Sequence, residues 1–484
     1  MASLSRTPGP PPGGSPRETK PMSERWSAPV FDKAMILKYD RPGPRYTSYP
    51  TAPYFHEGFG PREYLREVEE TNAAPAPPPL SLYFHLPFCK SVCWFCGCNV
   101  TYTKDRGLGN AYVDHLLLEM DALKARMAPS RKVVQIHWGG GTPTFIPAPV
   151  LRRLWEGIAE RFPLDPEAEV GVEIDPREVT EEHLTLFREA GFNRISLGIQ
   201  DFDPTVQKAV HRIQPEALTR EVIARCRDLG FASINVDLIY GLPHQTAASF
   251  RYTLDRIVEL APDRIATFNF AYLPEMIRHQ RAIDREALPT AEEKLEIFKT
   301  AVETFTGAGY VFVGMDHFAR PEDELVKALK ERTLHRNFQG YTTKAGCDLY
   351  GIGVTSIGSL GRCYAQNAKA VAEYQRRVAE EGTAVFRGVR LTDDDLLRRD
   401  VITRLMCHFV LVKAEIEAKY GIAFDETFGD ALSDLVPMEK DGLIRLKADR
   451  IEVTSLGRLL VRNVAMAFDA YLRRGDAKRF SRTV

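Results

Sequence analysis

The feature that most restricts the fold is a regular alternation of short apolar segments with longer amphipathic segments between residues 80 and 318. The short segments have a period of two and are rich in branched and aromatic residues, which is typical of strands. The longer segments carry apolar residues at helical spacing. Such alternation predicts a parallel sheet with helical crossovers. We expect strands at residues 81–86, 133–139, 169–175, 194–200, 233–239, 264–271 and 311–317, and helices at 110–127, 147–161, 180–190, 216–229, 246–260 and 292–308.

These strands are too few for a closed eight-stranded barrel, so we predict an α/β fold with an open or partial (β/α)6 barrel and one extra strand. In each of the first six, one alternating set of side chains is apolar and the other is polar or small. In residues 194–200, for example, Ile195 and Leu197 alternate with Ser196 and Gly198. A closed barrel fills its lumen with branched apolar side chains. Polar inner faces therefore predict a wet or ligand-filled cavity; a half-exposed antiparallel sheet is the alternative for any single strand.

Half of the eight cysteines lie close together, at Cys89, Cys93, Cys96 and Cys98. Such crowding indicates a shared ligand. Structural zinc sites usually use two separated ligand pairs, and no second cysteine or histidine pair lies nearby. Thiolates at the spacing Cys-x3-Cys-x2-Cys can instead wrap a compact iron–sulfur cluster and leave one iron open. Zinc binding and redox thiols remain the alternatives.

A run of three glycines, Gly139 to Gly141, follows the strand predicted at 133–139 and precedes Thr142. Glycines let backbone N–H groups approach a polar ligand closely, although one glycine would serve a tight turn. Their place at the C-terminal end of a barrel strand favours ligand binding. Glu173 and Asp175 end another strand and suit either acid–base chemistry or, as we prefer, the hydroxyl and ammonium groups of a ligand.

The cysteine motif resembles that of the radical S-adenosylmethionine (SAM) superfamily. Together with Tyr83 and His85 before it and Asn99 after it, the motif is similar to that of the oxygen-independent coproporphyrinogen III oxidases, over nearly the whole chain from residue 36. The resemblance implies a [4Fe–4S] cluster on Cys89, Cys93 and Cys96. It also implies a SAM site, whose residues would be Tyr83, Phe95, Gly140, Gly141, Thr142, Glu173, Gln200, Arg212, Asp237, Ala271 and Ile357.

By the same resemblance, the chain is an enzyme that decarboxylates two propionates of coproporphyrinogen III to vinyl groups, giving protoporphyrinogen IX for haem. SAM cleavage at the reduced cluster would supply 5′-deoxyadenosyl radicals. We expect catalytic roles for Cys98, His85 and Tyr83; a histidine beside a cluster can tune its potential. Expected partners are the substrate and an electron donor such as a flavodoxin or ferredoxin. A monomer is expected.

The substrate carries four carboxylates, so we expect basic residues around it. The candidates are Arg41, Arg45, His335, Arg336 and Lys344. Residues 36–53 contain several prolines and predict an extended arm that closes over the substrate, with Tyr46 and Tyr49 offering flat faces to the macrocycle. A plain surface loop is the alternative.

The expected organisation has five parts. They are a disordered Pro/Gly-rich tail at 1–29, the arm with a short helix at 30–79, the partial barrel at 80–318, a connecting extension at 319–385, and a mainly helical, winged-helix-like domain that covers the substrate at 386–484. In the extension we expect short helices with loops up to 365 and a helix at 366–381. In the last domain we expect helices at 392–409, 412–420, 425–436 and 456–473 and a hairpin at 441–454.

Composition excludes several function classes. The formal net charge is −1, so no global field attracts nucleic acid. No apolar run reaches the length of a membrane span, and no secretory signal is visible. Clustered cysteines without such a signal predict the cytoplasm. Two other functions remain: a haem chaperone related to these oxidases, which typically lacks Cys98, the arm and the segment Phe338 to Thr343, and a zinc-stabilised binding module, which leaves the glycine run unexplained.

Overall fold

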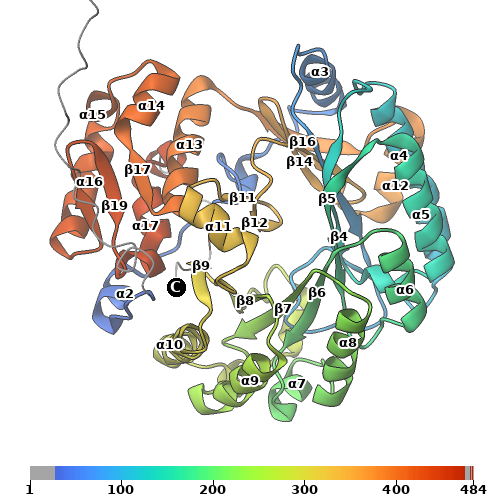
Figure 1. The fold of residues 1–484 in the computed structure, drawn as a ribbon, viewed down its shortest axis with the longest axis horizontal. Helices are drawn as coiled ribbons and strands as arrows, with labels where there is room; N and C mark the ends of the chain where they lie inside the picture. The colour runs from blue at the N-terminus through green and yellow to red at the C-terminus, as the bar shows by residue number, and fades with distance from the viewer. Residues whose placement is uncertain (1–27, 475–479, 481, 483–484) are drawn as a thin grey trace, which may run out of the picture.

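The computed structural model describes residues 28–474, 480 and 482. The tail expected at 1–29 therefore lies almost entirely outside the described residues. A large curved sheet with helices on its outer side occupies one half of the molecule, and a mainly helical region faces the inner side of the sheet (Figure 1). Within the described ranges, no helix is long and apolar enough to cross a bilayer.

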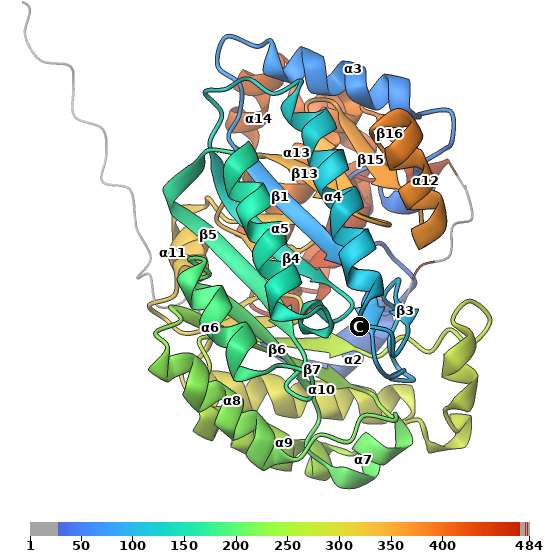
Figure 2. The same ribbon diagram turned by 90° about the vertical axis from the view of Figure 1, so that its right-hand side faces the viewer.

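The expected six-stranded parallel unit is confirmed. Strands β1, β4, β5, β6, β7 and β8 are neighbours in that order, and each adjacent pair is parallel. Helices follow them on the outer side (Figure 2). The strands are β1 (Leu80–Leu86), β4 (Val133–Gly140), β5 (Leu164–Ile174), β6 (Arg194–Gln200), β7 (Ser233–Tyr240) and β8 (Arg264–Asn269). The helices are α4 (Leu108–Lys124), α5 (Ala148–Arg161), α6 (Glu181–Glu189), α7 (Pro204–Ala209), α8 (Glu216–Asp228), α9 (Ala247–Leu260) and α10 (Ala291–Gly307).

The sheet extends beyond this unit at both edges. The extra strand predicted at 311–317 is two short strands that turn at Met315 and Asp316: β10 (His317–Ala319) is antiparallel to both β8 and β9 (Val311–Gly314). On the other edge, β13 (Asp348–Ile352) pairs parallel with β1. Antiparallel β14 (Ile357–Leu360), β15 (Cys363–Asn367) and β16 (Val385–Arg390) follow, so this sheet has twelve strands among the described residues.

The segment 319–365 was expected to hold only short helices and loops, and this was wrong. Its strands are short, so their period of two spans too few residues to be recognised. The helix expected at 366–381 begins later, as α12 (Val371–Glu381), because residues up to Asn367 belong to β15. The boundary expected at residue 385 falls at the first residue of β16, which still pairs with β15. The other elements here are α11 (Glu324–Glu331), β11 (His335–Asn337) and β12 (Gly340–Thr342).

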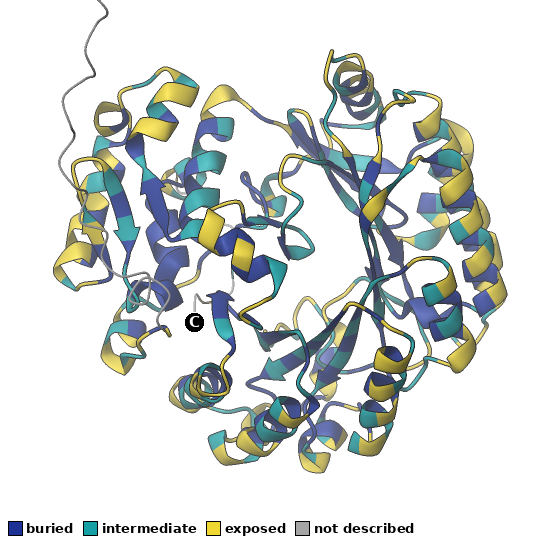
Figure 3. Cartoon of the chain, in the orientation of Figure 1, coloured by how far each residue is buried: buried dark blue, intermediate teal, exposed yellow. Residues whose placement is uncertain are grey.

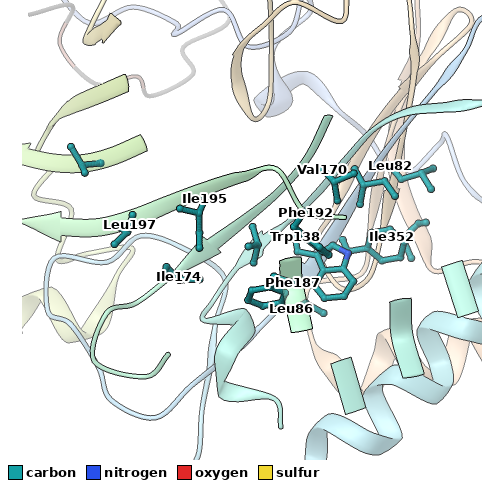
Figure 4. Packing of buried hydrophobic residues seen from close by; sticks show 14 of the residues in the cluster. Leu82, Leu86, Trp138, Val170, Ile174, Phe187, Phe192, Ile195, Leu197 and Ile352 are labelled. Carbon is teal, nitrogen blue, oxygen red and sulfur yellow. The ribbon is translucent and has the colours of Figure 1, made fainter. Parts of the chain in front are cut away.

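The alternation of side chains along the strands is confirmed by burial. In β6, Ile195, Leu197 and Ile199 are buried and the residues between them are half-buried. The buried set packs against the helices, and the outer side of the sheet is buried beneath them (Figure 3). Trp138 lies at the centre of this core, with its ring centroid 4.9 Å from that of Phe192 and 6.2 Å from that of Phe187 (Figure 4). The polar side chains of the other set therefore point into the space enclosed by the curved sheet.

The N-terminal arm is not simply extended. It begins with α2 (Lys33–Tyr39), which Asp32 caps by accepting a hydrogen bond from the Met35 N–H at 3.0 Å. The extended path follows, and α3 (Pro61–Asn72) comes after it. Tyr46 and Tyr49 are only 5% and 1% exposed, within a second core formed with the C-terminal helices. The expectation that these two rings face a macrocycle is wrong, because other side chains already cover them.

The C-terminal region is mainly helical with one small sheet, which confirms its expected class. Its helices are α13 (Asp393–His408), α14 (Lys413–Tyr420), α15 (Phe424–Thr427) and α16 (Gly429–Lys440), and its strands are β17 (Val410–Val412), β18 (Ile444–Leu446) and β19 (Arg450–Val453). The single helix expected at 456–473 is broken into η5 (Gly457–Leu460), α17 (Val461–Met466) and α18 (Ala470–Arg473). Asp469 causes the second break, because its side chain caps α18.

Candidate active site

The cysteine-rich loop lies at the C-terminal end of β1, where the next short strand, β2 (Phe88–Cys89), pairs with β3 (Thr101–Tyr102). Segments far away in the sequence hold this loop. His279, in η3 (Arg278–Ala282), has its Nε2 2.7 Å from the carbonyl oxygen of Cys96. His211 binds the Val92 carbonyl through Nδ1 at 2.7 Å, and its ring stacks on Trp94. The loop is therefore fixed from both sides.

Two arginines approach the thiol of Cys93. Arg177 Nη2 lies 3.4 Å and Arg212 Nη1 lies 3.5 Å from Cys93 Sγ. Both guanidiniums also bind Asp175, at 2.6 and 2.9 Å. Burial alone raises the pKa of Asp175, but the two arginines outweigh it and lower that pKa to about 2. The carboxylate of Asp175 therefore accepts hydrogen bonds from both arginines and does not act as an acid–base partner of Glu173.

The residues of this loop fit an iron–sulfur cluster. Three thiols lie on one short loop, and two arginine side chains approach the sulfur of Cys93. A hydrogen bond from Cys98 lowers the pKa of the Cys96 thiol to about 7. Throughout the described ranges, no three His, Cys, Asp or Glu side chains converge as a single metal ion requires. The spacing of the three cysteines along the loop suits a polynuclear cluster, whose thiolate ligands bind different irons.

His85 and Tyr83 form one hydrogen-bonded unit at the base of the loop. His85 Nε2 is 2.9 Å from the carbonyl oxygen of Asn99, which can only accept, so Nε2 carries the proton. His85 Nδ1 therefore accepts from the Tyr83 hydroxyl at 3.2 Å. The Tyr83 ring stacks on His137 with a centroid distance of 6.0 Å. Both ring nitrogens of His85 are thus engaged by protein groups and link the loop to the inner face of β1.

The glycine run lets β4 pass closely between side chains and backbone. A Cβ atom on Gly140 would lie 2.6 Å from the His85 ring, and one on Gly141 would lie 2.8 Å from the Phe88 carbonyl oxygen. The N–H groups of Gly140, Gly141 and Thr142 donate to Glu173, to the Leu86 carbonyl and to the Phe88 carbonyl. The expectation that this run offers its N–H groups to a ligand is therefore not met.

Glu173 lies on the inner face of β5 and receives two hydrogen bonds. His137 Nε2 is 3.1 Å from its Oε1, and the Gly140 N–H donates to its Oε2 at 3.2 Å. Burial alone raises the pKa of Glu173, but these contacts hold it below its usual range. The side chain is 43% accessible although protein atoms surround it on many sides. That accessibility fits a solvent-filled space within the curved sheet.

The structure brings four of the expected SAM residues, Tyr83, Glu173, Gln200 and Asp237, to the inner faces of strands in the parallel unit. Asp237, on β7, accepts from Ser196 at 3.1 Å and from Asn235 at 2.9 Å. Burial and then the charge of Glu173 raise the pKa of Asp237 to about 6. A Cβ atom on Gly198 would lie 2.9 Å from the side chain of Gln200 and 3.1 Å from that of Arg212, so these two meet at the end of β6.

Ala271, Phe95 and Ile357 lie at the margins of this group. Gln280 Nε2 donates to the carbonyls of Phe95 and Ala271, at 3.2 and 3.1 Å, and thereby joins the cysteine loop to the end of β8. Ile357 lies on β14, two strands from β1, and packs against a separate apolar cluster around Phe55.

The basic candidates differ in their availability to an anion. Arg45 forms an ion pair with Asp316, and Arg336 is buried. Burial and the charge of Arg399 lower the pKa of His335 to about 4, so His335 is neutral at pH 7. A cavity of about 480 Å³ lies near Arg45, between α2, α10 and the C-terminal region, and Ala271 is part of its wall.

Sequence reasoning missed Arg177, His279 and Gln280. Arg177 directly follows Asp175 and Pro176 at the end of β5, a position where barrel enzymes place ligand-binding groups. The position of Arg177 at the end of a predicted strand could therefore have indicated a role in the site. His279 and Gln280 lie 183 and 185 residues from the loop carbonyls that they bind, and no local pattern indicates such contacts.

Comparisons with known proteins agree with this geometry. The family model of the radical SAM superfamily matches residues 83–257, and that of the HemN C-terminal domain matches residues 391–460. The oxygen-independent coproporphyrinogen III oxidase of Escherichia coli is 46% identical over 94% of this chain and 98% of its own length. The Synechocystis protein of the same name is 44% identical over 94% of this chain and 98% of its own.

A solved structure also matches. Coproporphyrinogen III oxidase (HemN) from Escherichia coli, described as a radical SAM enzyme, superposes with a TM-score of 0.87 at 44% identity. The match covers 92% of this chain and all of the other chain. The partial barrel and the helical C-terminal region are therefore both shared.

Proposed function

Because this chain belongs to the oxygen-independent coproporphyrinogen III oxidases of the radical SAM superfamily, we propose that it converts two propionates of coproporphyrinogen III to vinyl groups, giving protoporphyrinogen IX. The observation that carries this function is the cysteine loop at the mouth of a curved sheet whose inner face is polar. The chain is thus an oxidoreductase of haem biosynthesis. Relatives that match 94% of it are named as oxidases, which favours this function over a haem chaperone.

The cofactors are a [4Fe–4S] cluster and SAM, which when bound supply a 5′-deoxyadenosyl radical. In this proposal Cys89, Cys93 and Cys96 hold the cluster. Arg177 and Arg212 stabilise the thiolate of Cys93, since both lie within 3.5 Å of its sulfur. The loop contacts of His279 and Gln280 keep the cluster rigidly placed against the inner face of the sheet.

The proposed SAM site joins Tyr83, Glu173, Gln200, Arg212 and Asp237. Carboxylates of this kind suit an ammonium group or ribose hydroxyls. The carbonyl groups of Gly140, Gly141 and Thr142 can contact the ligand, because their N–H groups already donate within the protein. Phe95, Ala271 and Ile357 complete the proposed set at its margins.

We assign positioning and proton-handling roles to the remaining three residues. Tyr83 and His85 fix the loop through the Asn99 carbonyl. Cys98 is exposed and adjoins Cys96, which favours a role in turnover without cluster ligation.

Further parts of the proposal concern organisation and partners. In this proposal the C-terminal region, which faces the inner side of the sheet (Figure 1), covers the substrate together with the arm. We propose a monomer that works in the cytoplasm with a flavodoxin or ferredoxin as electron donor. All eight cysteines are free thiols in the structure, which suits a reducing compartment.

The function is tested by an anaerobic assay. The reconstituted protein, given coproporphyrinogen III, SAM and a reductant, should release CO2 and form protoporphyrinogen IX, which is detected after oxidation as protoporphyrin IX. A Glu173→Ala variant with full iron content should lose most SAM cleavage and product. Haem binding by the wild type without any vinyl product would instead support the chaperone.

Binding of SAM should depend on pH through Asp237. Its pKa is raised to about 6, so the carboxylate that would bind ribose hydroxyls is present only above that value. SAM affinity should therefore fall as the pH drops through about 6, approaching about tenfold per unit well below it. Anaerobic equilibrium dialysis from pH 5 to pH 8 measures this, with iron content checked at each pH. An Asp237→Asn variant should bind more weakly at pH 8 and lose the dependence; an unchanged pH profile in it would remove Asp237 from the site.

A further inference from the structure

Arg336 is a buried cation that forms no ion pair within the described part of the chain. It lies on β11, is 8% exposed, and stacks over the Tyr341 ring at 5.3 Å. Its Nε and Nη1 atoms have no hydrogen-bond acceptor among the described residues. Leaving a guanidinium buried and unpaired costs stability, so a folded protein rarely keeps one without a use.

The charges of Arg336 and of two further arginines from distant segments influence one another and one carboxylate, that of Asp316. Arg45 of the arm pairs with Asp316, and Arg462 of α17 donates to the carbonyls of Pro44 and Arg482 at 3.0 and 3.1 Å. Burial alone raises the pKa of Asp316, but Arg45, His317 and Arg336 hold it far below its usual range. Burial, Arg45 and Arg336 lower the pKa of Arg462 to about 10. Positive charge is therefore in excess around Asp316.

Part of this group borders the cavity of about 480 Å³, a volume suited to a small-molecule ligand, whereas Arg336 is not one of the residues that line it. Arg45, Asp316 and Arg462 line the cavity directly. Its remaining wall is largely apolar, with Tyr240, Phe270 and Phe298 among its side chains. An apolar wall beside excess cations matches the chemistry of a pyrrole ring that carries a carboxylate. The cavity is not lined by the cysteine loop itself. It is connected to that loop through Ala271, which lines the cavity and whose carbonyl accepts a hydrogen bond from Gln280.

We propose that Arg45, Arg336 and Arg462 form the seat for one propionate carboxylate of the substrate, one that does not react while it is bound there. This inference rests on the proposed function and adds which charges recognise the tetracarboxylate. Asp316 neutralises part of the positive charge and orients Arg45 when no substrate is bound. A substrate carboxylate supplies the anion that Arg336 lacks.

The test measures binding, without cluster, SAM or turnover. Coproporphyrin III, the fluorescent oxidised form, carries the same four propionates, and its tetramethyl ester carries none. Arg336→Met should weaken coproporphyrin III binding about 10- to 100-fold, the range for a charged hydrogen-bonding group. Affinity for the ester should not change. Arg336→Lys should recover part of the loss. Arg251→Met is the matched control, because Arg251 is 56% exposed on α9 and pairs with Asp255.

Stability gives a second readout. Removal of an unpaired buried cation should leave the Tm of Arg336→Met unchanged or raise it. Equal coproporphyrin III affinity in wild type and variant would overturn the seat, as would an equal loss for acid and ester or a clear fall in Tm. These outcomes are separate from the function: a wild type that forms no vinyl product in the anaerobic assay would remove the oxidase assignment, whereas normal turnover with unaltered binding in Arg336→Met would remove only the seat.

Discussion

Replacing Cys93 by alanine is expected to prevent cluster assembly and abolish turnover together. Cys93 is 8% exposed and lies against the half-buried Arg177 and the buried Arg212, so loss of its thiol leaves both guanidiniums facing a gap. Partners outside the ligand shell are worth about 10- to 100-fold in metal affinity or activity, so loss of a ligand itself should exceed about 100-fold. Iron and acid-labile sulfide after anaerobic reconstitution, followed by the decarboxylation assay, measure the effect.

Cys89→Ala and Cys96→Ala should behave like Cys93→Ala, and two other cysteines serve as controls. Cys98→Ala should keep its iron but lose turnover, and Cys226→Ala, in the outer core, should keep both. A full complement of iron and sulfide in any of the three ligand variants would show that the ligand assignment is wrong. Loss of the cluster in Cys98→Ala would make Cys98 a ligand.

The second large effect is on stability. Tyr49→Ala should destabilise the C-terminal region by about 3–5 kcal/mol, the range for removing a fully buried aromatic side chain. Tyr49 is 1% exposed and its hydroxyl accepts from the Ala470 N–H at 3.0 Å. Urea unfolding followed by circular dichroism measures the free energy of unfolding. Iron content should be retained at low temperature, because the ring lies in the second core and not beside the cysteine loop.

Tyr49→Phe separates the hydrogen bond from the packing and should cost only about 1 kcal/mol. Tyr252→Ala is the control for truncating a tyrosine, since Tyr252 is 45% exposed on α9. If Tyr49→Ala unfolds like Tyr252→Ala, the arm contributes no packing energy and its burial has no energetic role.

Local patterns predicted the six parallel strands well, and the reason is physical. Strands such as β6 are long enough to show their period of two, and the helices between them are long enough to show a stripe. The strands β13 to β16 were missed because they are short. In addition, β13 pairs with β1, more than 260 residues earlier, and a helix separates β15 from its partner β16, so no local pattern indicates these pairings. The break at Asp469 was missed because apolar spacing on both sides of it continues the helical pattern.

For the site, the positions of Glu173, Gln200 and Asp237 on inner faces follow from alternation alone. Alternation does not predict which other side chain each of these residues binds. The bridge from Asp175 to Arg177 and Arg212 depends on the path of the chain after β5 and α7. The burial of Tyr46 and Tyr49 depends on helices that come more than 400 residues later, so these two rings were misread as a binding surface.

That separation has a consequence for how the molecule is made. The hydroxyl of Tyr46 donates to Asp469 at 2.9 Å, across 423 residues. At a synthesis rate of about 5–20 residues per second, the arm waits roughly 20 to 85 s on the ribosome for the helices that enclose it. The curved sheet up to β8 is contiguous in sequence and needs no such delay. The cysteine loop therefore emerges early in synthesis, whereas the arm is enclosed only when the C-terminal helices reach it.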